Sequence, residues 1–539
     1  MKVLLLVPKY TYNNKSPKKN YHYFFPMGLA YISAVLKDTT HEIDIVNLNH
    51  KDGTIEELIN FNLNRKEYDV VLSGEMALGY NVIEKMVMAI RKHRSNPKII
   101  IGGAIITSEP HLMIKNLDFD YGIVGEGENT IVELLECLEN KGDAKNVDGL
   151  CWKGDNGVAI FTNQRVVIND LDSLPFPDYE GFEFGEYLDN MSATDALFTV
   201  FDYPRMYPLL ASRGCPYQCT FCYHSLGPKY RDRSMDNIME EIEYAIKKFR
   251  INSINVTDDL FSINKDRVYE FCKRIKEIID SLDYDFKWAC QLTVSSVDKD
   301  LLKTMKDAGC FWVSFGFESY SPVVLKSMKK PITPEHIRNS IKWCLELEVG
   351  FEGAFIFGDS AETNETAKET LDFWVNECQG QIGIFFIQPY PGSEMYNRAI
   401  KKGVIKDKMD FIRNKICKTN FINMTDSMSD KDFKNLVRTI AKLRAKHCKY
   451  QIHDKIIKEG KDKYEVQVKC PFCKVINKYK NCYLPNPHYY TIYNVCRHCA
   501  KRYYAVSRLY KFTINYYTEL DLLRRSYLYV QNVLKAKRI

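Results

Sequence analysis

The chain has 539 residues, which at roughly 150 residues per domain suggests three or four domains. Hydrophobic residues make up 45% and charged residues 27%, a balance that excludes wholesale disorder. The longest apolar runs fall well short of the about 18 residues of a membrane span, and the apolar start, Val3–Val7, is too short for a signal peptide. We therefore expect a cytoplasmic protein whose 17 cysteines serve as metal ligands more readily than as disulfides.

Charge is unevenly distributed along the chain. Residues 441–539 hold 22 Lys and Arg against 6 Asp and Glu, a net charge of +16, whereas residues 1–440 hold 53 against 63, a net charge of −10. The asymmetry favours an acidic or nucleic-acid partner for the C-terminal part, and simple solubility is the alternative explanation.

Residues 1–140 alternate short apolar, β-rich runs with helical patterns, which is typical of a doubly wound parallel sheet. Ligands bind such sheets beyond the carboxyl ends of the strands. Glycines there let a bulky ligand approach the backbone, although each glycine pair is also compatible with an ordinary turn. The predicted strands are Val3–Val7, Ile43–Leu48, Val70–Ser73 and Lys98–Ile101, the helices Gly28–Lys37, Thr54–Leu63 and Tyr80–His93, and the candidate ligand contacts Ser73, Gly102, Gly103, Gly125, Glu126 and Gly127.

Residues 141–200 are expected to connect two domains, because Asp170–Pro177 contains two prolines and no helical period. Residues 201–400 resume the strand–helix alternation with six predicted strands, which indicates a full or partial β/α barrel. These strands are Leu209–Ser212, Ser253–Thr257, Phe286–Val294, Phe311–Phe317, Gly353–Phe357 and Ile382–Gln388. Beyond the barrel we expect a helical segment, a small cysteine-bearing module and a helical tail, at residues 401–460, 461–510 and 511–539.

The strongest motif is a cysteine triplet, Cys215-x3-Cys219-x2-Cys222, on the loop after the first predicted barrel strand. Three thiolates at this spacing can ligate three irons of a 4Fe–4S cubane and leave the fourth iron open to a substrate. The alternatives are a zinc site with His224 as the fourth ligand, or unrelated buried cysteines. The position of the triplet at the top of a barrel strand favours the cluster.

The triplet, with aromatic Phe221 before its last cysteine, resembles the signature of radical S-adenosylmethionine (SAM) enzymes. In that superfamily SAM chelates the open iron, and one-electron reduction from an external flavodoxin- or ferredoxin-type donor cleaves SAM to a 5′-deoxyadenosyl radical. Residues 1–140 resemble the cobalamin-binding (B12-binding) branch, through the segments Pro26–Ala30, Ile101–Gly103 and Val124–Glu128. The resemblance covers residues 1–400 and implies a Rossmann-like cobalamin domain followed by a TIM-like radical SAM barrel.

One departure concerns the lower face of cobalt. The Asp-x-His-x-x-Gly signature of cobalamin domains with an axial histidine is absent from this sequence. The resemblance therefore implies cobalamin with its nucleotide tail in the sheet crevice and no histidine on cobalt. A domain that has lost cobalamin and binds only substrate is the alternative.

Two polar pairs follow predicted barrel strands, where side chains of β/α barrels point into the active site. The resemblance implies that Asp258 and Asp259 hold the amino group of SAM, and a helix N-cap is the alternative. Glu318 and Ser319 resemble the element that contacts the SAM ribose, whose hydroxyls suit carboxylate acceptors. His224 is expected to be a loop residue unless it serves the cluster or transfers protons.

A second metal motif lies near the C-terminus. Cys470-x2-Cys473 and Cys496-x2-Cys499 are two CxxC pairs separated by 22 residues, which predicts a tetrahedral zinc ribbon. An auxiliary iron–sulfur cluster is the alternative. Zinc would organise a module too small to bury its own core. We expect this basic module to lie near the substrate entrance.

These motifs and the resemblance predict a cobalamin-dependent radical SAM methyltransferase that methylates an unactivated carbon through a 5′-deoxyadenosyl radical and methylcobalamin. One alternative is a non-methylating enzyme of the same branch that closes rings oxidatively or rearranges its substrate. The other is a nucleic-acid-modifying enzyme that uses the basic ribbon. The identity of the substrate does not follow from the sequence.

Overall fold

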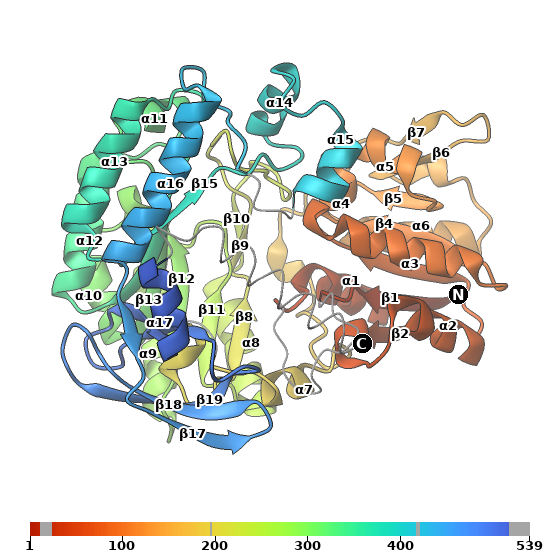
Figure 1. Cartoon of the computed structure of the whole chain (residues 1–539). Coiled ribbons are helices and arrows are strands. Elements are labelled where there is room, and N and C mark those ends of the chain that lie inside the picture. The colour runs from red at the N-terminus through yellow and green to blue at the C-terminus, as the bar shows by residue number, and fades with distance from the viewer. Residues whose placement is uncertain (11–23, 194–196, 417–420, 517–539) are drawn as a thin grey trace.

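The computed structural model describes residues 1–10, 24–193, 197–416 and 421–516. Figure 1 shows an N-terminal α/β unit beside a second α/β unit, with β17, β18 and β19 of a C-terminal module below the second unit. Two largely parallel sheets with helices between their strands confirm the predicted α/β class. In the part of the chain that is described, no helix is both long enough and apolar enough to traverse a membrane.

The N-terminal sheet has seven strands in the order β2-β1-β3-β4-β5-β6-β7. The first five pair in parallel, and β6 and β7 continue the sheet as an antiparallel hairpin. The order reverses at β1, which pairs with both β2 and β3, so the ligand crevice of this doubly wound sheet lies at the carboxyl ends of these strands. The strands are β1 (Lys2–Val7), β2 (Glu42–Asn47), β3 (Val70–Gly74), β4 (Lys98–Gly102), β5 (Tyr121–Ile123), β6 (Leu150–Lys153) and β7 (Ala159–Phe161).

Helices cover both faces of this sheet, as its continuous apolar strands require. Val3, Leu5 and Val7 face the core that contains α1 and α6, whereas Leu4 and Leu6 face the core that contains α2 and α3. The alternation explains why β1 has no polar position between Val3 and Val7. The helices are α1 (Met27–Lys37), α2 (Ile55–Arg65), α3 (Tyr80–Lys92), α4 (Ala104–Ser108), α5 (Pro110–Asn116) and α6 (Glu128–Glu139).

The stretch from 141 to 200 contains more structure than a bare connector. The hairpin β6–β7 belongs to the N-terminal sheet. The proline-rich stretch includes a single 3-10 turn at Leu171–Ser173, because the Asp170 side chain accepts a hydrogen bond from the Asp172 amide. A short helix, α7 (Phe184–Asp189), and a second 3-10 turn, η5 (Phe198–Val200), lead into the second unit.

The second unit is a six-stranded parallel sheet in the order β15-β14-β13-β12-β11-β8. It is a partial barrel with two open edges, β8 and β15, which confirms the predicted architecture. The strands are β8 (Met206–Leu209), β11 (Ser253–Val256), β12 (Lys287–Leu292), β13 (Cys310–Glu318), β14 (Gly350–Phe357) and β15 (Gly383–Phe386), and a two-residue hairpin, β9 (Ser212–Arg213) and β10 (Arg231–Asp232), follows β8. The helices are α8 (Met235–Phe249), α9 (Lys265–Ser281), α10 (Lys299–Asp307), α11 (Pro322–Ser327), α12 (Pro334–Glu346) and α13 (Asn364–Glu377).

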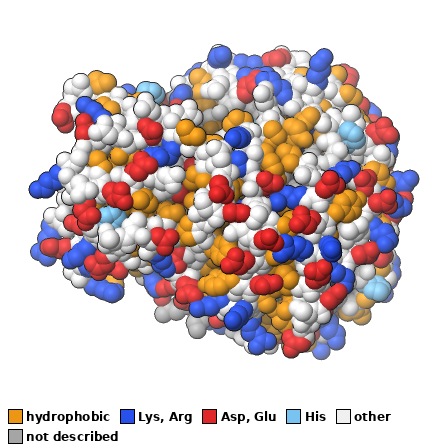
Figure 2. Space-filling model, turned by 180° about the vertical axis from the view of Figure 1, so that it is seen from behind, with side chains coloured by type: hydrophobic (Ala, Val, Ile, Leu, Met, Phe, Trp, Pro, Cys, Tyr) orange, Lys and Arg blue, Asp and Glu red, His pale blue; other side chains and the backbone are white. Residues whose placement is uncertain are grey.

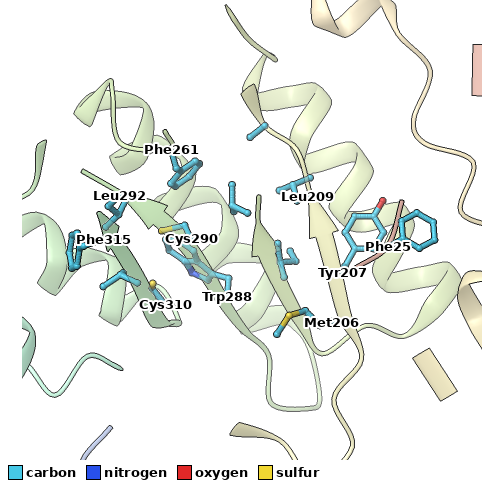
Figure 3. Close-up of a cluster of buried hydrophobic side chains, with 14 of the residues drawn as sticks. Phe25, Met206, Tyr207, Leu209, Phe261, Trp288, Cys290, Leu292, Cys310 and Phe315 are labelled. Carbon is cyan, nitrogen blue, oxygen red and sulfur yellow. The ribbon is translucent and has the colours of Figure 1, made fainter. Parts of the chain in front are cut away.

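Each strand of the barrel has one face towards the helices and one towards the interior. Trp288, Cys290 and Leu292 lie on the same face of β12 within the hydrophobic core (Figure 3). Trp288 packs edge-on against Phe271 of α9. Gln291 lies on the opposite face and is exposed although its strand is central, so the interior of the barrel is open at its height.

The C-terminal region begins with helices that pack on both units. α14 (Glu394–Lys401), α15 (Lys408–Asp410) and the following π-turn (Phe411–Lys415) belong to the core of the N-terminal unit, and α16 (Asp430–His447) packs beside α13. Two three-stranded sheets follow, formed by β16 (Tyr450–Ile452), β17 (Lys455–Gly460), β18 (Lys463–Lys469), β19 (Ile476–Tyr483), β20 (Thr491–Val495) and β21 (Arg502–Val506). Helix α17 (Arg508–Tyr516) begins the predicted tail, and residues 517–539 of that tail lie outside the described residues.

Candidate active site and metal centre

The cysteine triplet lies on a loop between β9 and β10, directly after the first barrel strand. Gly214 begins this loop with a φ of +85°, and a Cβ there would stand 2.2 Å from the Lys229 carbonyl oxygen, so glycine is required. The Thr220 amide donates to the Met328 carbonyl at 3.0 Å, and the Thr220 carbonyl accepts from the Met395 amide at 2.8 Å. The loop is therefore held from two sides, with Cys219 buried, Cys215 half-buried and Cys222 exposed.

A half-buried cation, Lys330, lies beside these cysteines. Its Nζ is 2.9 Å from Glu318 Oε1, at the carboxyl end of β13. Burial lowers the pKa of Lys330, but the negative charges of Glu318, Cys219 and Cys222 outweigh burial and raise it overall. Sequence reasoning missed Lys330, because a lysine on a turn carries no signal of burial. Its charge would stabilise thiolates or a bound carboxylate at this place.

The two aspartates after β11 have different surroundings. Asp258 is buried and accepts hydrogen bonds from the Ala211 amide at 2.7 Å and the Ser212 hydroxyl at 2.6 Å, and burial raises its pKa to about 6. It therefore fixes the end of β8. Asp259 is exposed at the site, where desolvation raises its pKa and the nearby charge of His224 opposes the rise. Neither aspartate caps a helix, because α9 begins later, with Asn264 as its cap.

The other predicted contacts around the cluster loop are also placed by the fold. Ser319 is buried and its hydroxyl lies 3.2 Å from that of Thr370, so its hydrogen bonds are internal to the barrel. Phe221 packs against a hydrophobic cluster that contains residues of both units. The Nε2 atom of His224 is buried and has no hydrogen-bond partner among the described residues. His224 is therefore a polar group at the cluster loop whose hydrogen-bonding capacity is not used by the protein.

The glycine-bearing strand ends of the N-terminal sheet lie along its carboxyl edge. Gly103 has a φ of +85°, and a Cβ there would stand 2.8 Å from the Glu75 carbonyl oxygen. Gly125, with a φ of +86°, faces open space instead, so it leaves room for a ligand to approach the backbone. Gly102, which ends β4, is also open, because a Cβ there would meet its nearest neighbour only at 3.7 Å. Gly127 packs against Ile32, and the Ser73 hydroxyl donates a hydrogen bond to the Leu6 carbonyl.

Glu126 connects the two units. Its carboxylate accepts hydrogen bonds from Arg231 at 2.8 and 2.9 Å, from Arg213 at 3.2 Å and from the Ile168 amide at 2.9 Å. Glu128 adds a second ion pair with Arg213, at 2.8 Å. All four charged side chains are buried. Because Arg213 precedes the cysteine loop by two residues, this network joins the carboxyl edge of the N-terminal sheet to the base of the loop.

Three described histidines of the N-terminal unit have protein partners at one or both ring nitrogens. His50 follows β2, and its Nδ1 lies 2.7 Å from Glu183 Oε2 while its Nε2 lies 3.4 Å from Asn47 Nδ2. His41 contacts the N-terminal amine, and His93 contacts Ser95 and Asn64. His22 lies outside the described residues.

The C-terminal cysteines form a second, separate site. The sulfurs of Cys470, Cys473, Cys496 and Cys499 all lie within 4.8 Å of one another. Two of their separations are 3.8 Å and 3.6 Å, which match the about 3.8 Å edge of a tetrahedron with metal–sulfur bonds of about 2.3 Å. A cubane binds each cysteine through a different iron and needs wider spacing, so the geometry suits one tetrahedral ion.

The surroundings of this site support the same conclusion. Each CxxC pair is the tip of a hairpin: Cys470 and Cys473 lie between β18 and β19, and Cys496 and Cys499 lie between β20 and β21. The Phe472 amide and the Asn477 side-chain amide each donate to a cysteine sulfur at 3.4 Å, as partners of metal thiolates do. Cys482 does not belong to the four-sulfur group and bonds to the Tyr479 carbonyl.

The module, which we expected near the substrate entrance, lies at the amino end of the barrel strands. Val495 of the module packs against Ala289 and Trp312, at the amino ends of β12 and β13. The cysteine loop follows the carboxyl end of β8, so the module closes the opposite end of the barrel (Figure 1). Two cations of the module pair within the chain: Arg497 with Asp202 at 2.9 Å and Arg502 with Glu352 of β14 at 4.0 Å. On the face shown in Figure 2, positive and negative side chains are interspersed.

Comparison with known proteins identifies both units. Residues 209–373 match the radical SAM superfamily, and residues 19–135 match the B12-binding domain. The chain therefore contains a radical SAM domain and a B12-binding domain, as the sequence predicted, and its C-terminal cysteine group is consistent with a zinc-ribbon-like module.

Its relatives include two methyltransferases. An uncharacterized methyltransferase of Pyrococcus horikoshii is 29% identical over 387 residues, which are 70% of this chain and 79% of the relative. Cytidylyl-2-hydroxyethylphosphonate methyltransferase of Streptomyces wedmorensis is 26% identical over 467 residues, or 76% of this chain and 84% of the relative. The structure of the radical SAM methyltransferase TsrM from Kitasatospora setae shares the fold, with a TM-score of 0.60 and 16% identity over 75% of this chain and 76% of that chain.

Proposed function

We propose that this chain is a cobalamin-dependent radical SAM methyltransferase that acts on an unactivated carbon. The observation that carries the proposal is the contact between its two cofactor-binding edges. Arg213, at the base of the cysteine loop, is ion-paired with Glu126 and Glu128, which follow Gly125 at the end of β5. Both cofactors would therefore face one space between the two units, where proximity replaces diffusion between reaction steps.

The bound groups would supply hydrogen-atom abstraction at a 4Fe–4S cluster with SAM, and methyl delivery from cobalamin. Cys215, Cys219 and Cys222 would ligate three irons. Lys330 would hold positive charge beside the thiolates and the SAM carboxylate, where burial strengthens its field. We assign Asp259 to the SAM amino group and Glu318 to the ribose hydroxyls.

The neighbours of these residues have supporting roles. Asp258 fixes the end of β8 through Ala211 and Ser212, and Ser319 fixes the end of β13 through Thr370. On the other side, the open space at Gly125 would admit cobalamin, whose tail would enter the crevice between β1 and β3. Because Glu126 is fully engaged by arginines, we propose that it joins the two units rather than contacts the cofactor.

Several further assignments belong to this proposal. The four C-terminal cysteines bind zinc, since their spacing is that of one tetrahedral ion. The thiolates and the cluster require a reducing compartment such as the cytoplasm and one electron from an external donor. The functional units are the cobalamin domain at 1–140, the radical SAM barrel at 201–400 and the zinc ribbon at 461–510.

Anaerobic reconstitution tests the proposed function. The purified protein should bind about one cobalamin in its one crevice, and reduction should cleave SAM to 5′-deoxyadenosine. Cys219→Ala should lose the cluster absorbance and SAM cleavage. Cys290→Ala is the matched control, because Cys290 is a buried cysteine of β12 that is not part of the cysteine loop, and it should keep both. SAM cleavage that survives Cys219→Ala would contradict the cluster assignment.

A further inference from the structure

The C-terminal ribbon contacts the chain on both sides of the opening in the barrel. The barrel sheet is open between β8 and β15, its two edge strands. Arg497 of the ribbon donates two hydrogen bonds to the Thr199 carbonyl, at 3.1 and 3.0 Å, and forms an ion pair with Asp202 at 2.9 Å. Thr199 and Asp202 lie just before β8, so the ribbon holds the segment that leads into the first edge.

The same hairpin of the ribbon also holds the segment before the last edge. The Arg502 amide donates to Gln381 Oε1 at 2.7 Å, and Gln381 Nε2 donates to the Arg502 carbonyl at 3.2 Å. Lys501 reaches Gln379 at 3.1 Å. Gln379 and Gln381 immediately precede β15. One hairpin thus contacts the chain before both edges of an open sheet whose edge strands do not pair with each other.

The ribbon residues that make these contacts lie next to the cysteine site in the sequence. Arg497 lies between Cys496 and Cys499, and Arg502 follows them by three residues. The other hairpin adds a contact to the segment before β8, because the Lys480 amide donates to Asp202 Oδ1 at 3.4 Å. A metal at the four sulfurs would join the two hairpins and fix the distance between the groups that hold β8 and those that hold β15.

We propose that the four-cysteine metal site is a clasp that closes the partial barrel at its amino end and sets the separation of β8 and β15. This inference rests on the proposed zinc site and not on the methyl-transfer reaction. It goes beyond a zinc that only folds its own module, because it predicts that loss of the metal destabilises the edge strands of the barrel. Since β8 leads directly to the cysteine loop, the clasp would position that loop from the opposite end of the strand.

Hydrogen exchange of the full-length protein tests the clasp. Cys499→Ser should lose the ribbon metal, and exchange should rise roughly tenfold in peptides that cover β8 and β15 but not in those that cover α9. Cys482→Ser is the matched control, because this buried cysteine of the same module lies outside the four-sulfur group, and it should keep metal and exchange unchanged. If Cys499→Ser loses its metal and both edges exchange as in wild type, the clasp is refuted.

Two further variants keep the test decisive if Cys499→Ser does not fold. Arg497→Ala should retain the metal and loosen the β8 side alone, and Gln381→Ala should loosen the β15 side alone. Unchanged exchange in both variants would also refute the clasp, as would a wild-type ribbon without metal. A protein that passes these tests but transfers no methyl group would contradict only the proposed function.

Discussion

The ion-pair network between the two units should respond strongly to the loss of one charge. Glu126→Gln keeps the shape of the side chain and one oxygen for the Ile168 amide, but it removes the charge that faces Arg213 and Arg231. Both arginines are at most 5% exposed. Breaking a buried ion pair by removing one partner costs about 3–5 kcal/mol, because the remaining charge stays out of water. We therefore expect Glu126→Gln to lower the free energy of unfolding by about 3–5 kcal/mol.

Two controls bracket this value. Glu128→Gln removes a single contact with Arg213 and should cost about 1.5–3 kcal/mol, as for one charged hydrogen bond. Glu377→Gln removes a half-exposed pair with Arg338 and should cost about 0–1 kcal/mol. Urea unfolding followed by fluorescence measures all three variants, and hydrogen exchange at 213–215 shows where the loosening occurs. A cost below about 1 kcal/mol for Glu126→Gln would refute the reasoning, because it would place this carboxylate in the range of a surface pair.

The same carboxylate gives a pH dependence. Burial alone would raise the pKa of Glu126, but the hydrogen bonds from Arg231 and Ile168 and the two arginine charges lower it below 4.5. A carboxyl with a lowered pKa in the folded state stabilises the protein above pH 4.5, and this contribution is lost as the pH falls further. The difference in unfolding free energy between wild type and Glu126→Gln should therefore be largest above that pH and shrink below it.

Three further predictions concern the barrel. Burial raises the pKa of Glu362 to about 8, so the free energy of unfolding should decline between pH 4.5 and 8 as the buried carboxyl loses its proton. Glu362→Gln should flatten this decline in urea unfolding measured across that pH range. An unchanged pH dependence in the variant would contradict the raised pKa of Glu362. Asp258→Asn should lower the free energy of unfolding by about 1–3 kcal/mol, because it disturbs the hydrogen bonds that fix β8. Asp259→Asn should leave the free energy of unfolding within about 0.5 kcal/mol of wild type and weaken SAM binding in calorimetry. If the Asp258 and Asp259 variants change stability and SAM binding equally, the two aspartates do not have the different roles assigned to them.

The sequence predicted those parts of the fold that depend on local pattern. The continuous apolar run of β1 indicates a strand buried on both faces, and helices do cover both faces. The CxxC spacing predicts that four sulfurs meet at one site, and the structure places them within 4.8 Å of one another. Local spacing was informative here because a short turn holds the two cysteines of each CxxC pair together.

Contacts between distant residues were not predictable in the same way. Glu126 had the position of a cofactor contact, but its partners Arg213 and Arg231 lie 87 and 105 residues away. The ribbon was expected at the substrate entrance, yet Arg497 contacts Thr199 across 298 residues at the other end of the barrel. An excess of Lys and Arg indicates that acidic partners are needed, but charge composition does not show whether those partners belong to another molecule or to the same chain.

The central claim is that this chain transfers a methyl group by way of cobalamin at a radical SAM site. The most direct test is anaerobic incubation of the reconstituted protein with a one-electron reductant and SAM that carries a deuterated methyl group, followed by mass spectrometry of the cobalamin and of any methylated product. We expect deuterated methylcobalamin together with 5′-deoxyadenosine, and loss of the 5′-deoxyadenosine in Cys219→Ala. Formation of 5′-deoxyadenosine with no label on cobalamin, in protein that contains cobalamin, would contradict methyl transfer and favour a non-methylating radical reaction.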